Sequence, residues 1–213
     1  MGIKRKKTVL FTFLLLAVTS YYHISSANEA GSNEASKIKI ERHFVFDTIP
    51  MNLKEITDSA DRIFAGKCIK AEEKEYEGLP VTEYKFKVTE AIKGVTDEEI
   101  TFRQWQPTVR DGGYTEGNKY ILFLFPDSEK GLTSPVGFAQ GKFEVETTGF
   151  IRRKEVVKNS LNNRGLNRNL KTQKRIAIKN NTFLNDYVHR CSELGIPMRY
   201  KEFVEAVKNL VEE

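Results

Sequence analysis

The stretch from Lys119 to Val145 contains two strand patterns of different kinds. Its first part, 120–125, is six consecutive apolar residues bounded by Pro126, which predicts a strand buried on both faces. Its second part, 142–146, alternates between apolar and charged residues and predicts a strand with one buried face. The glycines between the two parts are typical of a bulge or sharp bend in a closed sheet.

Four further strands and three helices are predicted around this centre. Apolar or alternating residues predict strands at 63–76, 82–92, 100–106 and 153–158. Asn52, with Glu55 three residues later, predicts the capped start of a short helix over 53–60. Apolar residues at helical spacing predict two closing helices, at 182–194 and 200–211.

The first 27 residues have the pattern of an export signal. Four basic residues at 4–7 precede an apolar core at 8–18, and small residues at 25–27 fit signal-peptidase cleavage between Ala27 and Asn28. The alternative is an uncleaved N-terminal anchor. We therefore expect an exported protein, either secreted, periplasmic or on the cell surface, with no transmembrane helix after cleavage.

Charge is unevenly distributed along the chain. The signal segment holds four of the 34 basic residues and no acidic one, so the remaining chain has 30 basic and 29 acidic residues. Residues 151–190 contain 11 basic and 2 acidic residues, which suits an anionic partner such as nucleic acid, lipid headgroups or cell-wall polymer. The alternative is that this block packs against the acidic part of the chain or is solvated.

The two cysteines, Cys68 and Cys191, both follow the signal segment. An exported chain with an even number of cysteines favours a disulfide, which here would join the closing helices to the strands. The alternative is two buried thiols.

The order of these elements resembles a known scaffold. The segments that carry the resemblance are ADRIFAGKCIKAEE, TEYKFKVTEAIKG, ITFRQW, GNKYILFLF and, most specifically, GFAQGKFEV. They resemble exported, largely uncharacterised bacterial OB-like barrel proteins, similar in scaffold to the netrin-like module and to tissue inhibitors of metalloproteinases. The resemblance implies a mainly β fold: a five-stranded OB-like barrel with a short N-terminal helix and a C-terminal helical pair. Those inhibitors act through a cysteine at the mature N-terminus, whereas no cysteine lies near Asn28 here.

This interpretation divides the chain into five parts. They are a signal peptide (1–27), an N-terminal extension (28–47), the barrel (48–159), a basic Asn-rich linker (160–181) and the C-terminal helices (182–213).

The sequence contains no recognisable catalytic or metal-binding motif. Only two histidines, His43 and His189, follow the signal segment, and neither has cysteines or carboxylates at metal-ligand spacing. We therefore expect no enzyme activity, no metal and no cofactor. The candidate binding residues are Arg103, Trp105, Arg110, Tyr114 and Gln140, although Trp105 equally suits a core position.

Two functions remain in view from the sequence. The first is a non-catalytic binding or inhibitor-like module that contacts a protein or envelope polymer through barrel loops, chiefly 106–117. The alternative is binding of nucleic acid or another anionic polymer through the basic segment 151–190. Nucleic acid is the less favoured partner, because the predicted barrel is acidic and export removes the chain from most nucleic acid.

Overall fold

The computed structural model describes residues 49–109, 113–150, 152–167 and 182–212, with side chains from 186 in the last range. The predicted signal segment with Ala27 and Asn28, the N-terminal extension with His43, most of the Asn-rich linker and the candidate residue Arg110 lie outside the described residues.

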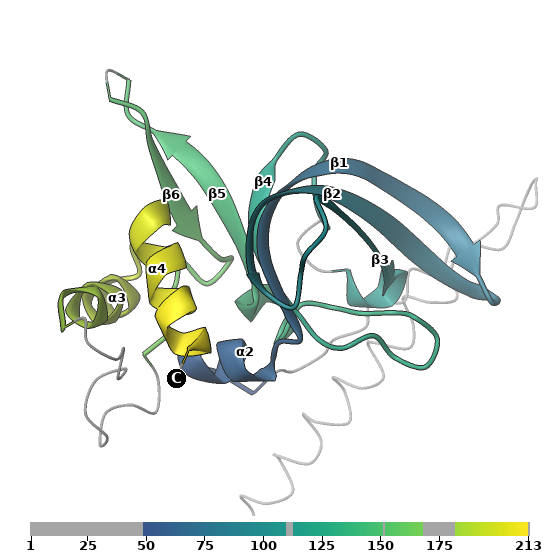
Figure 1. The fold of residues 1–213 in the computed structure, drawn as a ribbon, viewed down its shortest axis with the longest axis horizontal. Helices are drawn as coiled ribbons and strands as arrows, with labels where there is room; N and C mark the ends of the chain where they lie inside the picture. The colour runs from purple at the N-terminus through teal and green to yellow at the C-terminus, as the bar shows by residue number, and fades with distance from the viewer. Residues whose placement is uncertain (1–48, 110–112, 151, 168–181, 213) are drawn as a thin grey trace, which may run out of the picture. The chain divides into compact units, whose positions relative to one another are not determined.

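Seven antiparallel strands form one sheet, in the order β3-β2-β1-β4-β5-β6-β7 (Figure 1). Their bounds are Arg62–Tyr76 (β1), Leu79–Lys93 (β2), Glu99–Trp105 (β3), Lys119–Leu124 (β4), Lys142–Thr148 (β5), Lys154–Lys158 (β6) and Met198–Arg199 (β7). The α-helices within the described residues are α2 (Leu53–Ser59), α3 (Thr182–Leu194) and α4 (Tyr200–Val211). Two short 3₁₀ turns cover Gln106–Thr108 and Phe138–Gln140.

The mainly β class is confirmed, but the five-stranded barrel is wrong. The sheet has seven strands and stays open, because its end strands β3 and β7 do not pair with each other. The connection from β4 to β5 approaches the free edge of β3, where the Thr133 amide donates to the Arg103 carbonyl at 2.9 Å. That contact is a single bridge beside Leu132, so it does not extend the sheet.

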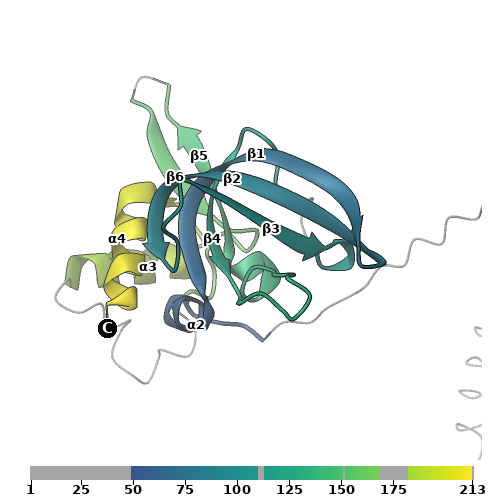
Figure 2. The same ribbon diagram turned by 45° about the vertical axis from the view of Figure 1, so that its right-hand side comes forward.

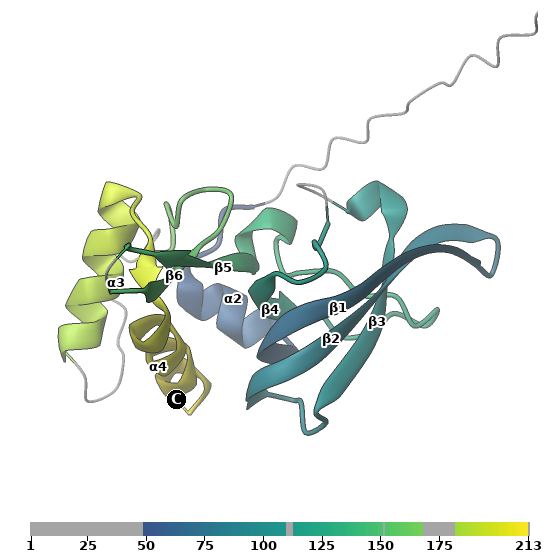
Figure 3. The ribbon, with the colours of Figure 1, turned by 90° about the horizontal axis from the view of Figure 1, so that it is seen from above.

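The central strand β4 separates two hydrophobic clusters. Tyr120, Leu122 and Leu124 join an aromatic cluster with β1, β2 and β3, whereas Ile121 and Phe123 join a second cluster with the helices. The predicted burial of this strand on both faces is therefore confirmed, and it explains why its apolar residues do not alternate. In Figure 3 the helices gather around β5 and β6, away from the far end of β1, β2 and β3.

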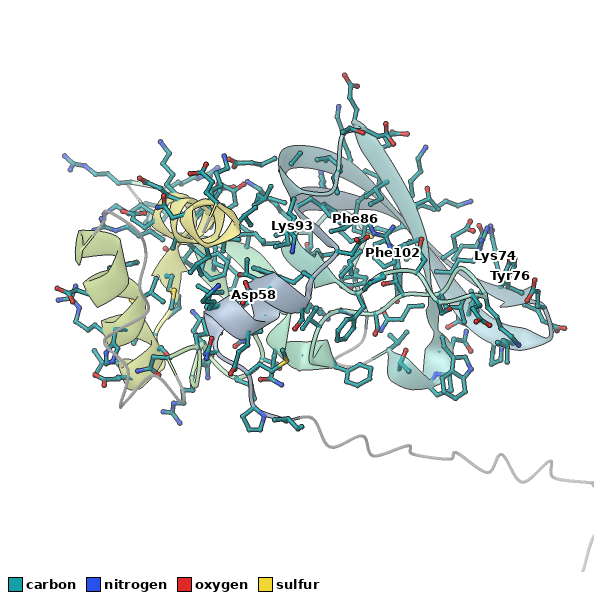
Figure 4. All side chains as sticks on the ribbon, turned by 60° about the horizontal axis from the view of Figure 1, so that its bottom comes forward. Asp58, Lys74, Tyr76, Phe86, Lys93 and Phe102 are labelled. Carbon is teal, nitrogen blue, oxygen red and sulfur yellow. The ribbon has the colours of Figure 1, made fainter. Side chains whose placement is uncertain are left out.

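Helix α2 is fixed at both ends by polar contacts. The Asn52 side chain accepts from the Glu55 amide at 2.9 Å, and the Glu55 carboxylate accepts from the Asn52 amide at 2.8 Å, which confirms the predicted capping box. At the other end the Lys93 ammonium donates to the carbonyl oxygens of Thr57 and Ala60, at 3.1 and 2.6 Å. A cation at this end also suits the helix dipole; Lys93 lies beside the helix in Figure 4.

The predicted disulfide is wrong, because Cys68 and Cys191 are both buried free thiols. Cys68 belongs to the aromatic cluster and Cys191 to the cluster that contains the helices, so the two side chains lie in different cores. The prediction assumed that α3 packs beside β1. Instead, the Tyr187 hydroxyl of α3 accepts a hydrogen bond from the Arg199 amide, at 2.7 Å, at the start of α4.

Candidate functional site

The sequence-based binding candidates are not brought together by the fold. Arg103 and Trp105 alternate with the buried residues Phe102 and Gln104 on β3, so they lie on the outer face of that strand. Tyr114 belongs to the aromatic cluster beneath the opposite face. The predicted ligand surface of Arg103, Trp105 and Tyr114 is therefore divided by the strand itself.

Arg103 is occupied by neighbours from the β1–β2 hairpin. Its Nε donates to Glu83 at 2.9 Å, and its guanidinium lies 4.4 Å from the centre of the Tyr76 ring. Glu83 also pairs with Lys74 at 2.7 Å, and that hydrogen bond is the main cause that lowers the Glu83 pKa. Figure 4 shows Lys74 and Tyr76 towards the end of this hairpin, far from α2. The arrangement is a network of local pairs that stabilises the hairpin.

Trp105 ends the same strand. It is half-buried and pairs across the ladder with Val81, whose side chain is fully buried. Since Val81 is on the outer face of β2, the indole covers an apolar spot on that face. This supports the packing alternative that the sequence left open for Trp105.

Tyr114 is a core residue. It is 4% exposed, and its ring makes edge contacts with Tyr84, Phe86 and Tyr120 at 4.6–5.3 Å between ring centres. Desolvation raises the Tyr114 pKa well above its ordinary value, so the hydroxyl stays protonated. The hydroxyl has no hydrogen-bond partner among the described residues. A ligand would have to open this cluster to reach it.

Gln140 holds two parts of the chain together. Its side-chain oxygen accepts from the Met51 amide at 2.7 Å, and its side-chain nitrogen donates to the Ile49 carbonyl at 3.1 Å. The residue is 5% exposed. Its role is to anchor the segment that leads into α2, which the sequence did not indicate because the two partners are about 90 residues away.

A groove between the start of β6 and the start of α4 is the strongest candidate site. It has a volume of about 440 Å³. The residues that line it are Arg153, Lys154, Glu155, Arg199, Tyr200, Lys201 and Glu202. Pairing of β6 with β7 brings the two walls together, since Val156 lies opposite Arg199 in the ladder.

The charges in this groove are unequal. Both of its carboxylates are paired: Glu155 contacts Lys119 at 3.1 Å, and Glu202 contacts Arg199 at 3.0 Å. Arg153, Lys154 and Lys201 form no ion pair within the described part of the chain. The groove therefore presents three cations that are available to an anion.

The floor of the groove is held in place by Tyr200. Its hydroxyl donates to Glu90 at 3.0 Å, and the Lys119 ammonium lies 3.8 Å from its ring centre. Burial is the main cause that raises the Tyr200 pKa. Desolvation alone would raise the Glu90 pKa, but hydrogen bonds from Lys208 and Tyr200 outweigh it and hold that pKa below its usual value. The polar groups at the floor of the groove are therefore bonded to one another.

The N-terminus of α4 adds to the positive potential. Arg199 occupies the N-cap position and makes no side-chain capping hydrogen bond. The dipole of this 12-residue helix places partial positive charge at its first turn. It reinforces the field of the neighbouring side chains.

Part of this groove was visible in the sequence. Arg153 and Lys154 belong to the basic segment 151–190. Arg199 and Lys201 were missed, because the contact between their turn and β6 depends on a two-residue strand, β7, that no apolar pattern marks. The basic residues at 168–179 lie outside the described residues.

The described residues also limit the kind of site. Within the ranges that the structure describes, no three His, Cys, Asp or Glu residues gather as a metal site. His189 lies 3.4 Å from Glu193 on the same helix. Among those ranges there is also no helix with the length and apolar character needed to span a membrane.

Comparisons of the chain with protein-family models, with curated proteins and with solved structures gave no match.

Proposed function

We propose that this chain is an exported, non-catalytic binding module whose ligand is an anionic polymer of the cell envelope, bound in the groove between β6 and α4. One observation carries the proposal: Arg153, Lys154 and Lys201 face the groove without an ion pair among the described residues, while both of its carboxylates are paired. Export follows from the predicted signal at residues 1–27.

The distribution of charge favours a polymer with repeated anionic groups. The three cations without an ion pair come from two separate segments, at 153–154 and 201, and within the described part of the chain no metal site accompanies them. Exposed cations at a surface groove attract an extended polyanion through summed weak contacts and release of counterions. Such binding needs no catalytic group.

The aromatic content of the groove supports an envelope polymer over single-stranded nucleic acid. Nucleic-acid grooves of this kind use exposed aromatic rings on which bases stack. Tyr200 is the single aromatic residue that lines the described groove, and it is 9% exposed, beneath Lys119 and tied to Glu90. Among the residues that line the groove, a base therefore finds no free ring face.

The resemblance to netrin-like modules and contact through the loop 106–117 are also part of the proposal. The single bridge between the β4–β5 connection and the β3 edge is compatible with the resemblance, although the sheet stays open. Residues 106–109 and 113–117 bound that loop, and its middle lies outside the described residues. An inhibitor-like contact there is compatible with the groove, because the two surfaces use different strands.

The test is a binding titration with linear inorganic polyphosphate as the probe. The variant Lys154→Ser/Lys201→Ser removes two of the three unpaired cations and is expected to weaken binding by about tenfold. The matched control is Lys87→Ser/Lys130→Ser, which changes the net charge equally at two exposed lysines outside the groove. Equal affinity losses in both variants would show that net charge, and not the groove, binds the polymer.

A further inference from the structure

The tip of the β5–β6 hairpin exposes an aromatic side chain that the fold does not use. Phe150 is 101% exposed, whereas Phe64, Phe86, Phe123, Phe143 and Phe203 are fully buried in the two clusters. A turn between two strands ordinarily carries glycine and polar residues. Full exposure of a phenylalanine at such a position means that its ring adds no packing within this chain and is available to another surface.

The hairpin tip stands free of the rest of the sheet. Pairing of β4 with β5 ends at Lys119 and Val145, and pairing of β6 with β7 ends at Val156 and Arg199. The last rungs, Thr147 with Glu155 and Thr148 with Lys154, have no neighbouring strand on either side. Figures 1 and 2 show this hairpin projecting beyond the other strands. Phe150 can therefore meet a flat surface without obstruction by the fold.

Three basic residues follow the exposed ring closely in the sequence. Beyond Ile151, which lies outside the described residues, Arg152, Arg153 and Lys154 are all exposed, and the sequence has no acidic residue from Thr147 to Lys154. None of the three cations forms an ion pair within the described ranges. Arg199 and Lys201 line the groove at the base of the same hairpin. The described part of the tip thus combines one exposed apolar side chain, Phe150, with three exposed basic side chains.

We propose that this hairpin tip docks on an anionic lipid surface, with the Phe150 ring among the acyl chains and Arg152, Arg153 and Lys154 at the headgroups. A hydrated polymer offers no apolar phase to an exposed ring, whereas a bilayer offers one directly beneath its charged headgroups. The inference rests on the proposed anion site, because Arg153 and Lys154 serve both, and it adds the membrane as the surface on which the module works.

The test uses the full chain and vesicles of phosphatidylglycerol mixed with phosphatidylcholine. Phe150→Ser is expected to weaken vesicle binding by about tenfold and to leave polyphosphate affinity within about twofold. Arg152→Ser/Arg153→Ser is expected to weaken vesicle binding by about 30-fold. Leu161→Ser, at another exposed apolar side chain, is the control and should leave vesicle binding unchanged. Every variant keeps residues 1–27, so any vesicle binding by that segment cancels in the comparison.

A site-specific readout locates the contact. The variant Trp105→Phe/Phe150→Trp carries a single indole, at the tip, since Trp105 is the natural chain's one tryptophan. We expect lipids brominated on the acyl chains to quench the fluorescence of this indole. They should not quench the fluorescence of Trp105 in the natural chain. Absence of quenching, or equal vesicle affinity of Phe150→Ser and the natural chain, overturns the lipid contact.

The outcomes separate this inference from the proposed function. If Phe150→Ser leaves vesicle binding unchanged while polyphosphate binding depends on Lys154 and Lys201, the proposed membrane contact is wrong and the groove remains the binding site. If vesicle binding depends on Phe150 but the chain does not bind polyphosphate, the membrane contact is supported and a soluble polymer is excluded as the ligand.

Discussion

Two tyrosine hydroxyls in the aromatic cluster differ in their hydrogen bonds. The Tyr120 hydroxyl accepts from the Thr115 amide at 3.0 Å, whereas the Tyr114 hydroxyl has no partner among the described residues. Tyr120→Phe should therefore lower the free energy of unfolding by about 1 kcal/mol, and Tyr114→Phe should leave it unchanged or raise it by about 1 kcal/mol. Urea denaturation of both variants measures the difference; a larger loss in Tyr114→Phe would contradict the assignment.

The two thiols should be protected in the folded chain. Burial raises the Cys68 pKa to about 11, and burial also raises the Cys191 pKa. At pH 8 the Cys68 thiolate is then roughly 100-fold scarcer than in the unfolded chain. Iodoacetamide should label both cysteines in urea and neither under native conditions at pH 8. A mass gain of about 2 Da on reduction would instead reveal a disulfide.

The same shift gives a pH dependence of stability. A pKa that is higher in the folded state means that folding favours the protonated thiol. Stability from Cys68 is therefore fully present below its ordinary pKa of 9.0 and is lost as the pH rises towards about 11. The urea midpoints of the natural chain and of Cys68→Ala can be compared at pH 8 and at pH 10.5. The difference between the two chains should be smaller at pH 10.5.

At the scale of elements, one glycine fixes the end of β2. Gly94 has φ +63°, and a Cβ there would lie 2.3 Å from the Asp61 carbonyl oxygen. Gly131 has nearly the same φ, +64°, with nothing within 4 Å of a Cβ. Gly131→Ala should lower stability by about 1 kcal/mol through the backbone alone, and Gly94→Ala by about 2–4 kcal/mol. If urea denaturation shows equal losses of stability in the two variants, the backbone has shifted to relieve the contact between the new Cβ at 94 and the Asp61 carbonyl oxygen.

Most helices and strands could be predicted from local patterns, because the residues that form each pattern lie within the helix or strand itself. The unbroken apolar run at 120–125 predicted β4, and Asn52 with Glu55 predicted the start of α2. The long-range pairings could not be predicted in the same way. β7 has two residues and exists because Met198 and Arg199 meet β6, a contact across about 40 residues that leaves no periodic pattern.

At the scale of the whole molecule, the errors share one physical cause. The barrel, the disulfide and the binding face all required the relative placement of distant segments, which periodicity does not encode. Strands β6 and β7 continue the sheet past β5, so β5 is not free to close on β3. The same continuation places α3 and α4 by β6 and brings Lys201 to Arg153, which creates the groove.

The most direct test of the account is a map of amide chemical shifts during titration with polyphosphate. We expect shifts centred on the two walls of the groove, at 153–155 and 199–202, and we expect them to need about tenfold more polyphosphate in Lys154→Ser/Lys201→Ser. Shifts centred on Arg103 and Trp105 on the outer face of β3, with the groove unchanged, would contradict the account.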